Sequence, residues 1–107
     1  MAKIGFIGMG NMATAIMKGL LKEFSPEDMI FSSAHEEKME KITRETGVPH
    51  VGSNAECARQ AKYLVLAVKP QVLPRVFGEI KDVVTREQVI ISIAEQHWQQ
   101  ISHSNQR

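Results

Sequence analysis

The chain has 107 residues, carries a net charge of +1 at pH 7 and contains one cysteine. This length predicts a single domain with a modest core, and the interspersed charges give no indication of a nucleic-acid or membrane partner. No apolar run approaches the roughly 20 residues of a membrane-spanning helix, and a strand pattern begins at the N-terminus in place of a signal peptide, so we expect a cytoplasmic protein.

The first predicted strand, residues 3–7, is followed by a glycine-rich turn and then by a helical pattern over residues 11–22. The turn reads Gly8-Met9-Gly10-Asn11-Met12-Ala13. This is the pattern G-x-G-x-x-A, which between a strand and a helix is typical of dinucleotide-binding domains.

Each small residue of the turn has a physical purpose in a dinucleotide site. Gly8 permits a tight turn, Gly10 lets a pyrophosphate approach the backbone, and Ala13 lets the helix pack close to the strand. The helix N-terminus then offers backbone N–H groups and the positive end of its dipole to the phosphates. We therefore predict dinucleotide binding; the alternative is a glycine-rich turn that joins strand and helix without a ligand.

Strands and helices alternate along the rest of the chain. Further strands are predicted at residues 29–32, 50–51, 63–68 and 89–93, and further helices at 34–46, 54–61 and 71–84. The fourth strand is apolar throughout, as strands buried on both faces of a parallel sheet are. Five strands alternating with four helices predict an α/β fold, a Rossmann-type doubly wound parallel sheet, in one domain.

Local signals mark several of the predicted helix ends. Ser33 with Glu36, and Ser53 with Glu56, form capping-box patterns at two helix starts. Gly47 is a C-terminal stop signal for the helix that begins after Ser33.

The end of the second predicted strand bears on the choice between NAD and NADP. NAD sites place an Asp or Glu there, about 20 residues beyond the glycines, whereas this chain reads F-S-S-A-H over residues 31–35. A carboxylate would repel a 2′-phosphate, while the Ser33 hydroxyl and helix N–H groups can donate to it, so NADP is favoured over NAD. Ser33 is also an N-cap candidate, and His35 and Lys38 either add positive charge or are solvated helix residues. The acidic pair at 36–37 argues mildly against a phosphate-selective pocket.

The end of the fourth strand is the other expected contact zone, because doubly wound sheets bind ligands beyond the carboxyl ends of their strands. There the chain reads Ala67-Val68-Lys69-Pro70. From its chemistry alone, Lys69 is either a cofactor contact or a surface lysine.

The single cysteine, Cys57, falls in a helical pattern, and we interpret it as a small, partly buried helix residue rather than a catalytic thiol. No histidine or second cysteine stands at a metal-ligand spacing from it, so no metal site is predicted.

Three blocks of the sequence resemble the N-terminal half of pyrroline-5-carboxylate reductases. They are F-I-G-M-G-N-M-A at residues 6–13, A-V-K-P at 67–70 and I-I-S-I-A at 90–94. The first two blocks together are quite specific, because related β-hydroxyacid dehydrogenases usually differ in the glycine block and lack the Lys-Pro. The resemblance covers residues 1 to about 94.

The resemblance implies an activity and a set of cofactor contacts. Members of this family reduce 1-pyrroline-5-carboxylate to L-proline, a step of proline biosynthesis, and hydride passes from NADPH or NADH to the imine carbon. By the same resemblance, Gly8 to Met12 would hold the pyrophosphate, Ser33 would face the 2′-phosphate, and Asn54 would contact the adenosine. The residues implied along the ribose and nicotinamide path are Ala67, Val68, Lys69, Pro70, Ile93 and Ala94.

The chain departs from the family after residue 94, where residues 95–107 form a divergent polar tail. We therefore expect a dinucleotide-binding domain at 1–94 without the C-terminal dimerisation and substrate domain, and a chain that is inactive alone. A β-hydroxyacid-dehydrogenase-like oxidoreductase and a non-catalytic NADP-binding module stay open as alternatives. We also expect an uncovered apolar face near the strand at 89–93, and self-association through it or cover by the tail.

Overall fold

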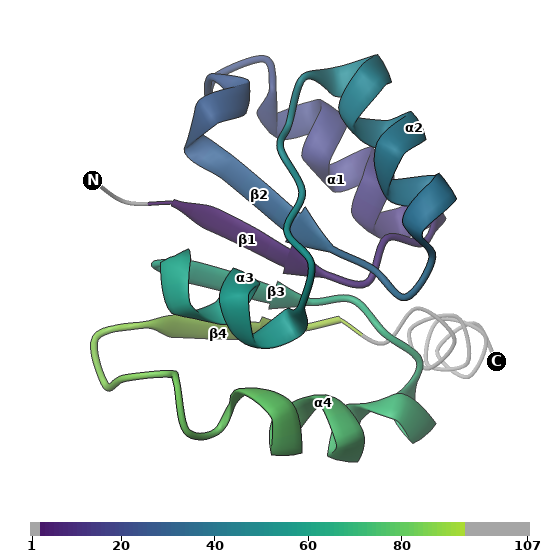
Figure 1. Ribbon diagram of the computed structural model, residues 1–107. Helices are drawn as coiled ribbons and strands as arrows, with labels where there is room; N and C mark the ends of the chain where they lie inside the picture. Colours follow the sequence, from purple (N-terminus) through teal and green to yellow (C-terminus); the bar gives the residue numbers. More distant parts are fainter. Residues whose placement is uncertain (1–2, 94–107) are drawn as a thin grey trace, which may run out of the picture.

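The computed structural model describes residues 3–93, which form a four-stranded parallel sheet with helices on both faces (Figure 1). The strands are β1 (Ile4–Ile7), β2 (Met29–Ser32), β3 (Tyr63–Leu66) and β4 (Val89–Ser92). Their order is β2-β1-β3-β4, and every pairing is parallel. The chain moves outward from β1 to β2 and then returns to β3 on the other side of β1, as doubly wound sheets do. The predicted fold class is confirmed.

Four α-helices pack on this sheet. They are α1 (Asn11–Leu20), α2 (Glu36–Thr46), α3 (Asn54–Gln60) and α4 (Leu73–Ile80), and the 3₁₀ turns are η1 (Pro26–Asp28) and η2 (Pro70–Val72). Helices α1 and α2 cover one face of the sheet, and α3 and α4 cover the other. None of these helices has the length and apolar character that crossing a membrane demands.

The core has two layers because successive side chains of a strand point to opposite faces of a sheet. Phe6, Phe31 and Val65 pack against α1 and α2, while Ile7 and Leu66 pack against α3 and α4. The strands β1 and β3 are therefore buried on both faces from Gly5 and Leu64 onward, which confirms the interpretation of the apolar run.

The prediction of a strand at residues 50–51 is wrong, because these residues do not join the sheet as a strand. His50 forms only an isolated bridge to Phe31, through hydrogen bonds from the Phe31 N–H to the Pro49 oxygen and from the Val51 N–H to the Phe31 oxygen. The chain then turns into α3, whose N-cap is Ser53, so no further ladder pairs form and the sheet has four strands rather than five.

Several predicted element ends also move. Helix α1 ends at Leu20 rather than at residue 22, β3 ends at Leu66 rather than at 68, and the helix predicted at 71–84 is η2 followed by α4. Gly47 does end α2, with φ of 80°, and the Ser53 hydroxyl accepts the Glu56 N–H at 3.1 Å as the capping pattern predicted.

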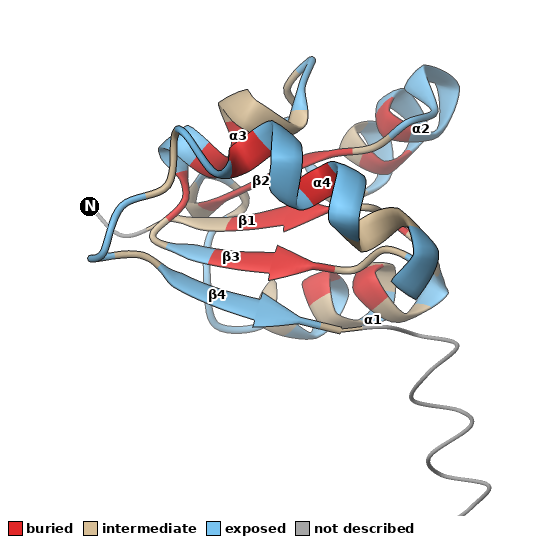
Figure 2. Cartoon of the chain, turned by 90° about the horizontal axis from the view of Figure 1, so that it is seen from below, coloured by how far each residue is buried: buried red, intermediate tan, exposed pale blue. Residues whose placement is uncertain are grey.

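The strand β4 forms one edge of the sheet, and its residues are coloured as exposed in Figure 2. Val89, Ile90 and Ile91 are each more than two-fifths exposed. The uncovered apolar face expected near this strand is therefore present among the described residues, whereas self-association through it stays a prediction. The expected polar tail, 95–107, lies outside the described residues.

Candidate functional site

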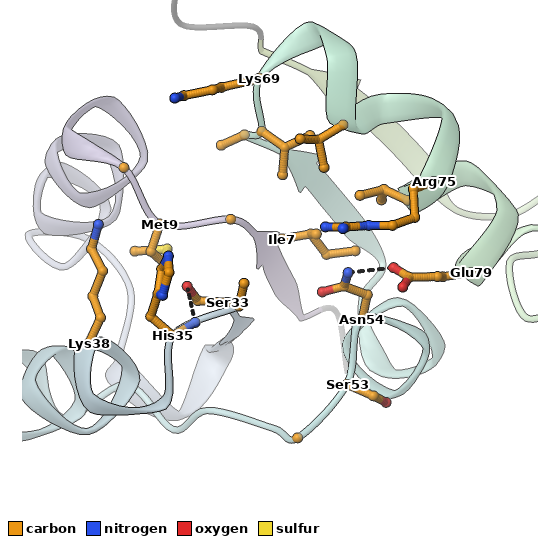
Figure 3. Close-up of a pocket in the computed structure, with 18 residues that line it drawn as sticks. Ile7, Met9, Ser33, His35, Lys38, Ser53, Asn54, Lys69, Arg75 and Glu79 are labelled. Carbon is orange, nitrogen blue, oxygen red and sulfur yellow. Dashed lines mark hydrogen bonds between the residues drawn. The ribbon is translucent and has the colours of Figure 1, made fainter.

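A cleft of about 520 Å³ opens at the carboxyl ends of β1, β2 and β3 (Figure 3). Its lining comes from residues 7–10, 33–35, Lys38, 52–54 and 67–69, together with one face of α4 and the residue before it. The cleft thus lies where the winding of the sheet reverses, between β1 and β3, which is the usual place for a ligand in such sheets.

Gly8 is required by the way two loops meet at the base of the cleft. Its φ is +88°, and a Cβ at this position would lie 2.5 Å from the Ala67 carbonyl oxygen and 2.7 Å from Val68 Cγ1. Backbone hydrogen bonds from the Gly8 N–H to the Ser32 oxygen (2.9 Å) and from the Ala67 N–H to the Ile7 oxygen (2.8 Å) hold the strand ends together. Only glycine fits here.

Helix α1 starts at the cleft. Gly10 is its N-cap in an extended conformation, with φ of −84° and ψ of −170°, and its carbonyl accepts the Thr14 N–H at 3.0 Å. No side chain caps the helix at Gly10, and because Met9 and Gly10 form part of the cleft wall, the positive end of the helix dipole lies beside the cleft. Ala13 is buried against the sheet, which gives the close packing that the sequence predicted.

Among the described residues, the wall that follows β2 carries positive charge and no carboxylate. Ser33, His35 and Lys38 line it, and the glutamates at 36–37 do not. The Ser33 hydroxyl accepts the His35 N–H at 3.4 Å, so the N-cap of α2 is His35. The predicted capping box at Ser33 is therefore wrong, because the residues at 33–35 form a turn before the helix begins.

Asn54 joins three elements across the floor of the cleft. The buried Ser32 hydroxyl donates to Asn54 Oδ1 at 2.7 Å, and Asn54 Nδ2 donates to Glu79 Oε1 at 2.7 Å. These two hydrogen bonds connect the end of β2, the start of α3 and the surface of α4, and they fix which way the amide of Asn54 faces.

The opposite wall is formed by the loop after β3 and by α4. Lys69 lines the cleft, which favours the first of the two interpretations of this lysine. Val72, Arg75, Val76 and Glu79 follow it at helical spacing and share one face. Among the described lining residues, three lysine or arginine side chains therefore accompany one carboxylate.

Most of the predicted contact residues meet in this cleft. Those that line it are Gly8, Met9, Gly10, Ser33, Asn54, Ala67, Val68 and Lys69. Asn11, Met12 and Pro70 are adjacent to the lining but do not belong to it, because the chain has already turned into α1 or η2. Ile93 packs with the core on the α1 side, and Ala94 lies outside the described residues.

The sequence interpretation missed Arg75 and Glu79. Their spacing from Val72 and Val76 was the available signal, since residues three, four and seven apart share a helix face. That signal was insufficient, because the sequence alone does not say which side of α4 borders the cleft.

Cys57 does not line the cleft. It is fully buried, and its thiol donates to the Phe6 oxygen at 3.5 Å. Burial raises the pKa of Cys57 to about 12, so the thiol is protonated at neutral pH and is a poor nucleophile. Within residues 3–93 no three His, Cys, Asp or Glu side chains gather as a metal site would require.

Comparison with known proteins places the chain among oxidoreductases. A family model described as NADP oxidoreductase coenzyme F420-dependent matches residues 3–96. The pyrroline-5-carboxylate reductase of Methanosarcina acetivorans is 38% identical over 94 residues, which are 86% of this chain and 35% of that protein. The chain thus spans about a third of the length of such relatives.

Solved structures show the same relationship. A pyrroline-5-carboxylate reductase from Coxiella burnetii superposes with a TM-score of 0.82 at 33% identity, covering 87% of this chain and 35% of that one. The pyrroline carboxylate reductase of Plasmodium falciparum, solved with NADP bound, superposes with a TM-score of 0.73 at 27% identity, covering 87% and 33%.

Proposed function

The chain belongs to the family described as NADP oxidoreductase coenzyme F420-dependent, and we propose that it is the dinucleotide-binding part of a pyrroline-5-carboxylate reductase. The observation that carries the proposal is the convergence of the glycine turn, Ser33 and the loop at 67–69 on one cleft. These segments are far apart in the sequence, and each has the chemistry that one portion of a dinucleotide requires.

The lining fits a dinucleotide in shape and in charge. Gly8 lets the glycine turn meet the loop after β3 at the base of the cleft, where a Cβ would collide with the Ala67 oxygen and with Val68, and the start of α1 favours the negative charge of a pyrophosphate. Asn54, with its amide fixed by two hydrogen bonds, is suited to the adenosine ribose, and residues 67–70 are suited to the path toward the nicotinamide. A reduced nicotinamide bound there would supply the hydride for reduction of the imine.

We assign NADP as the preferred cofactor. Within residues 3–93, no acidic side chain lines the wall after β2, where NAD sites place a carboxylate for the ribose 2′-hydroxyl. Ser33, His35 and Lys38 stand there instead and offer a hydroxyl, backbone N–H groups and positive charge. The glutamates that follow at 36–37 lie outside the lining and do not oppose a phosphate from within the cleft.

Calorimetric titration of the chain with NADPH and, separately, with NADH tests this proposal. We expect binding of both, with NADPH the tighter. Equal affinities would contradict the assignment of NADP, and no binding of either dinucleotide would contradict the proposed site.

Turnover requires a separate assay, because the chain spans only a third of the relatives' length. The second candidate is a non-catalytic module that binds NADP, and it is favoured by a cleft that residues 7–79 form on their own. Formation of proline from 1-pyrroline-5-carboxylate and NADPH by this chain would exclude the module. Oxidation of a β-hydroxyacid with NADP⁺ would instead indicate a β-hydroxyacid-dehydrogenase-like enzyme.

A further inference from the structure

Helix α4 brings two opposite charges to the cleft, Arg75 and Glu79, one helical turn apart. We infer that this helix tunes the choice between NADP and NAD: Arg75 binds the 2′-phosphate, and the Glu79 carboxylate weakens phosphate binding at the same place. The inference rests on the proposed dinucleotide site, and it adds a selectivity element on the wall opposite Ser33.

The packing of α4 fixes which of its faces borders the cleft. Val76 and Ile80 are each only 1% exposed and pack into the core on the α3 side of the sheet. This anchoring leaves Arg75 and Glu79 on the rim, where their exposed side chains line the cleft. Rotating the helix away from the cleft would expose both core residues, so the two charges stay at this position.

The two charged side chains differ in what they already contact. Glu79 accepts a hydrogen bond from Asn54, whereas Arg75 makes no ion pair with any carboxylate of the described residues. In Figure 3 the Arg75 side chain extends from α4 into the cleft on the same side as the hydrogen bond between Asn54 and Glu79. The guanidinium, a planar group that suits phosphate oxygens, is therefore available to a ligand.

Hydrogen bonds through Asn54 connect α4 to the end of β2, directly before Ser33. Ser32 precedes Ser33 directly, and it is joined to Glu79 by two successive hydrogen bonds of 2.7 Å through the single side chain of Asn54. The end of β2 and the rim of α4 are thus separated by one asparagine side chain. Ser33, Arg75 and Glu79 line this same cleft, and charges act on one another over roughly 8 Å at physiological salt.

The signs of the two effects are opposite. A phosphate monoester carries about −1.5 to −2 charges at pH 7, so Arg75 attracts it and Glu79 repels it. AMP lacks the 2′-phosphate and is affected much less by either residue. Adenosine 2′,5′-bisphosphate differs from AMP only by this group, and the ratio of the two affinities therefore isolates the 2′-phosphate.

The experiment is a calorimetric titration of the full chain and its variants with both nucleotides. Arg75→Gln should lower the affinity for the bisphosphate about tenfold, the equivalent of one charge-assisted hydrogen bond, and that for AMP less than about twofold. Arg75→Lys should recover part of the loss, and Glu79→Gln should raise the affinity for the bisphosphate about threefold, as removal of one partly screened like charge would.

Matched controls come from the loop before β4, which does not line the cleft. Arg86→Gln and Glu87→Gln remove the same charges from exposed positions and should leave both affinities unchanged. Thermal melting should show that all variants keep the wild-type fold, because every substituted side chain is exposed.

The experiment distinguishes failure of the proposed function from failure of the inference about α4. If the unaltered chain binds neither nucleotide, the proposed function is wrong and this inference falls with it. If it binds the bisphosphate more tightly than AMP and Arg75→Gln leaves that ratio unchanged, the proposed function stands and the role of α4 is refuted. A lower affinity for the bisphosphate after Glu79→Gln would also refute it.

Discussion

Replacing Gly8 with alanine tests the geometry that joins the fold to the site. The new Cβ would lie 2.5 Å from the Ala67 oxygen, in a residue whose φ is +88°. The left-handed conformation costs an L-residue about 1–2 kcal/mol, and overpacking against a fixed backbone adds about 1–3 kcal/mol. The Ala67 backbone has little room to retreat, because its N–H bonds the Ile7 oxygen at 2.8 Å.

We therefore expect Gly8→Ala to lower the free energy of unfolding by about 3 kcal/mol and to abolish NADPH binding. The assay is urea denaturation followed by far-ultraviolet circular dichroism, extrapolated to water. Gly19→Ala is the matched control, since nothing lies within 4 Å of a Cβ there, and it should raise the stability by about 0.5–1 kcal/mol. A loss below about 1 kcal/mol for Gly8→Ala, with NADPH binding intact, would refute the reasoning.

Three further predictions concern Ser33, Cys57 and the strand β4. Ser33→Ala should weaken NADPH binding about fivefold to tenfold, the loss of one hydrogen bond to a charged group, and weaken NADH binding less than about twofold; equal losses in calorimetry would contradict a role at the 2′-phosphate. Burial raises the pKa of Cys57 from 9.0 to about 12, so the folded state holds this proton more tightly and stability should fall as pH rises above 9.0 toward 12. Between about pH 8 and 10.5 the free energy of unfolding of the unaltered chain should fall about 2 kcal/mol further than that of Cys57→Ala. Parallel pH profiles of the two proteins would show that burial does not raise the pKa of this thiol. Self-association through β4 should appear in sedimentation velocity as a boundary that grows with concentration and that Ile90→Lys reduces; a monomer at every concentration would remove this prediction.

Local sequence signals predicted the parts of the fold that depend on local conformation. Gly8 and Gly47 have the positive φ that only glycine adopts readily, and Ser53 caps α3 as its pattern indicated. The apolar run before Lys69 was also predicted, because its composition fits a strand that is buried on both faces of a parallel sheet.

Sequence reasoning was less successful where the outcome depends on tertiary contacts. Ser33 has a good capping pattern, yet its hydroxyl accepts the N–H of His35 and the helix begins later. His50 pairs with β2 only once, because α3 begins too soon afterwards for a ladder to form. Arg75 and Glu79 are ordinary surface residues until the packing of α4 places them at the cleft.

The residues that line the candidate cleft were predicted in outline because its main segments follow directly on strand ends. Residues 8–10, Ser33 and residues 67–69 each stand immediately after a parallel strand, and all parallel strands end at the same edge of their sheet. No such rule applies to residues that helix packing brings to the cleft, and for this reason Arg75 and Glu79 were not predicted from the sequence.

The most direct test of the central claim is a titration of the ¹⁵N-labelled chain with NADP⁺, followed by the shifts of its backbone amide resonances. The account predicts that the largest changes cluster at residues 8–10, 33–35, Asn54 and 67–69, which line one cleft. Changes centred on β4 or on the loop at 81–88, or no changes at saturating NADP⁺, would contradict it.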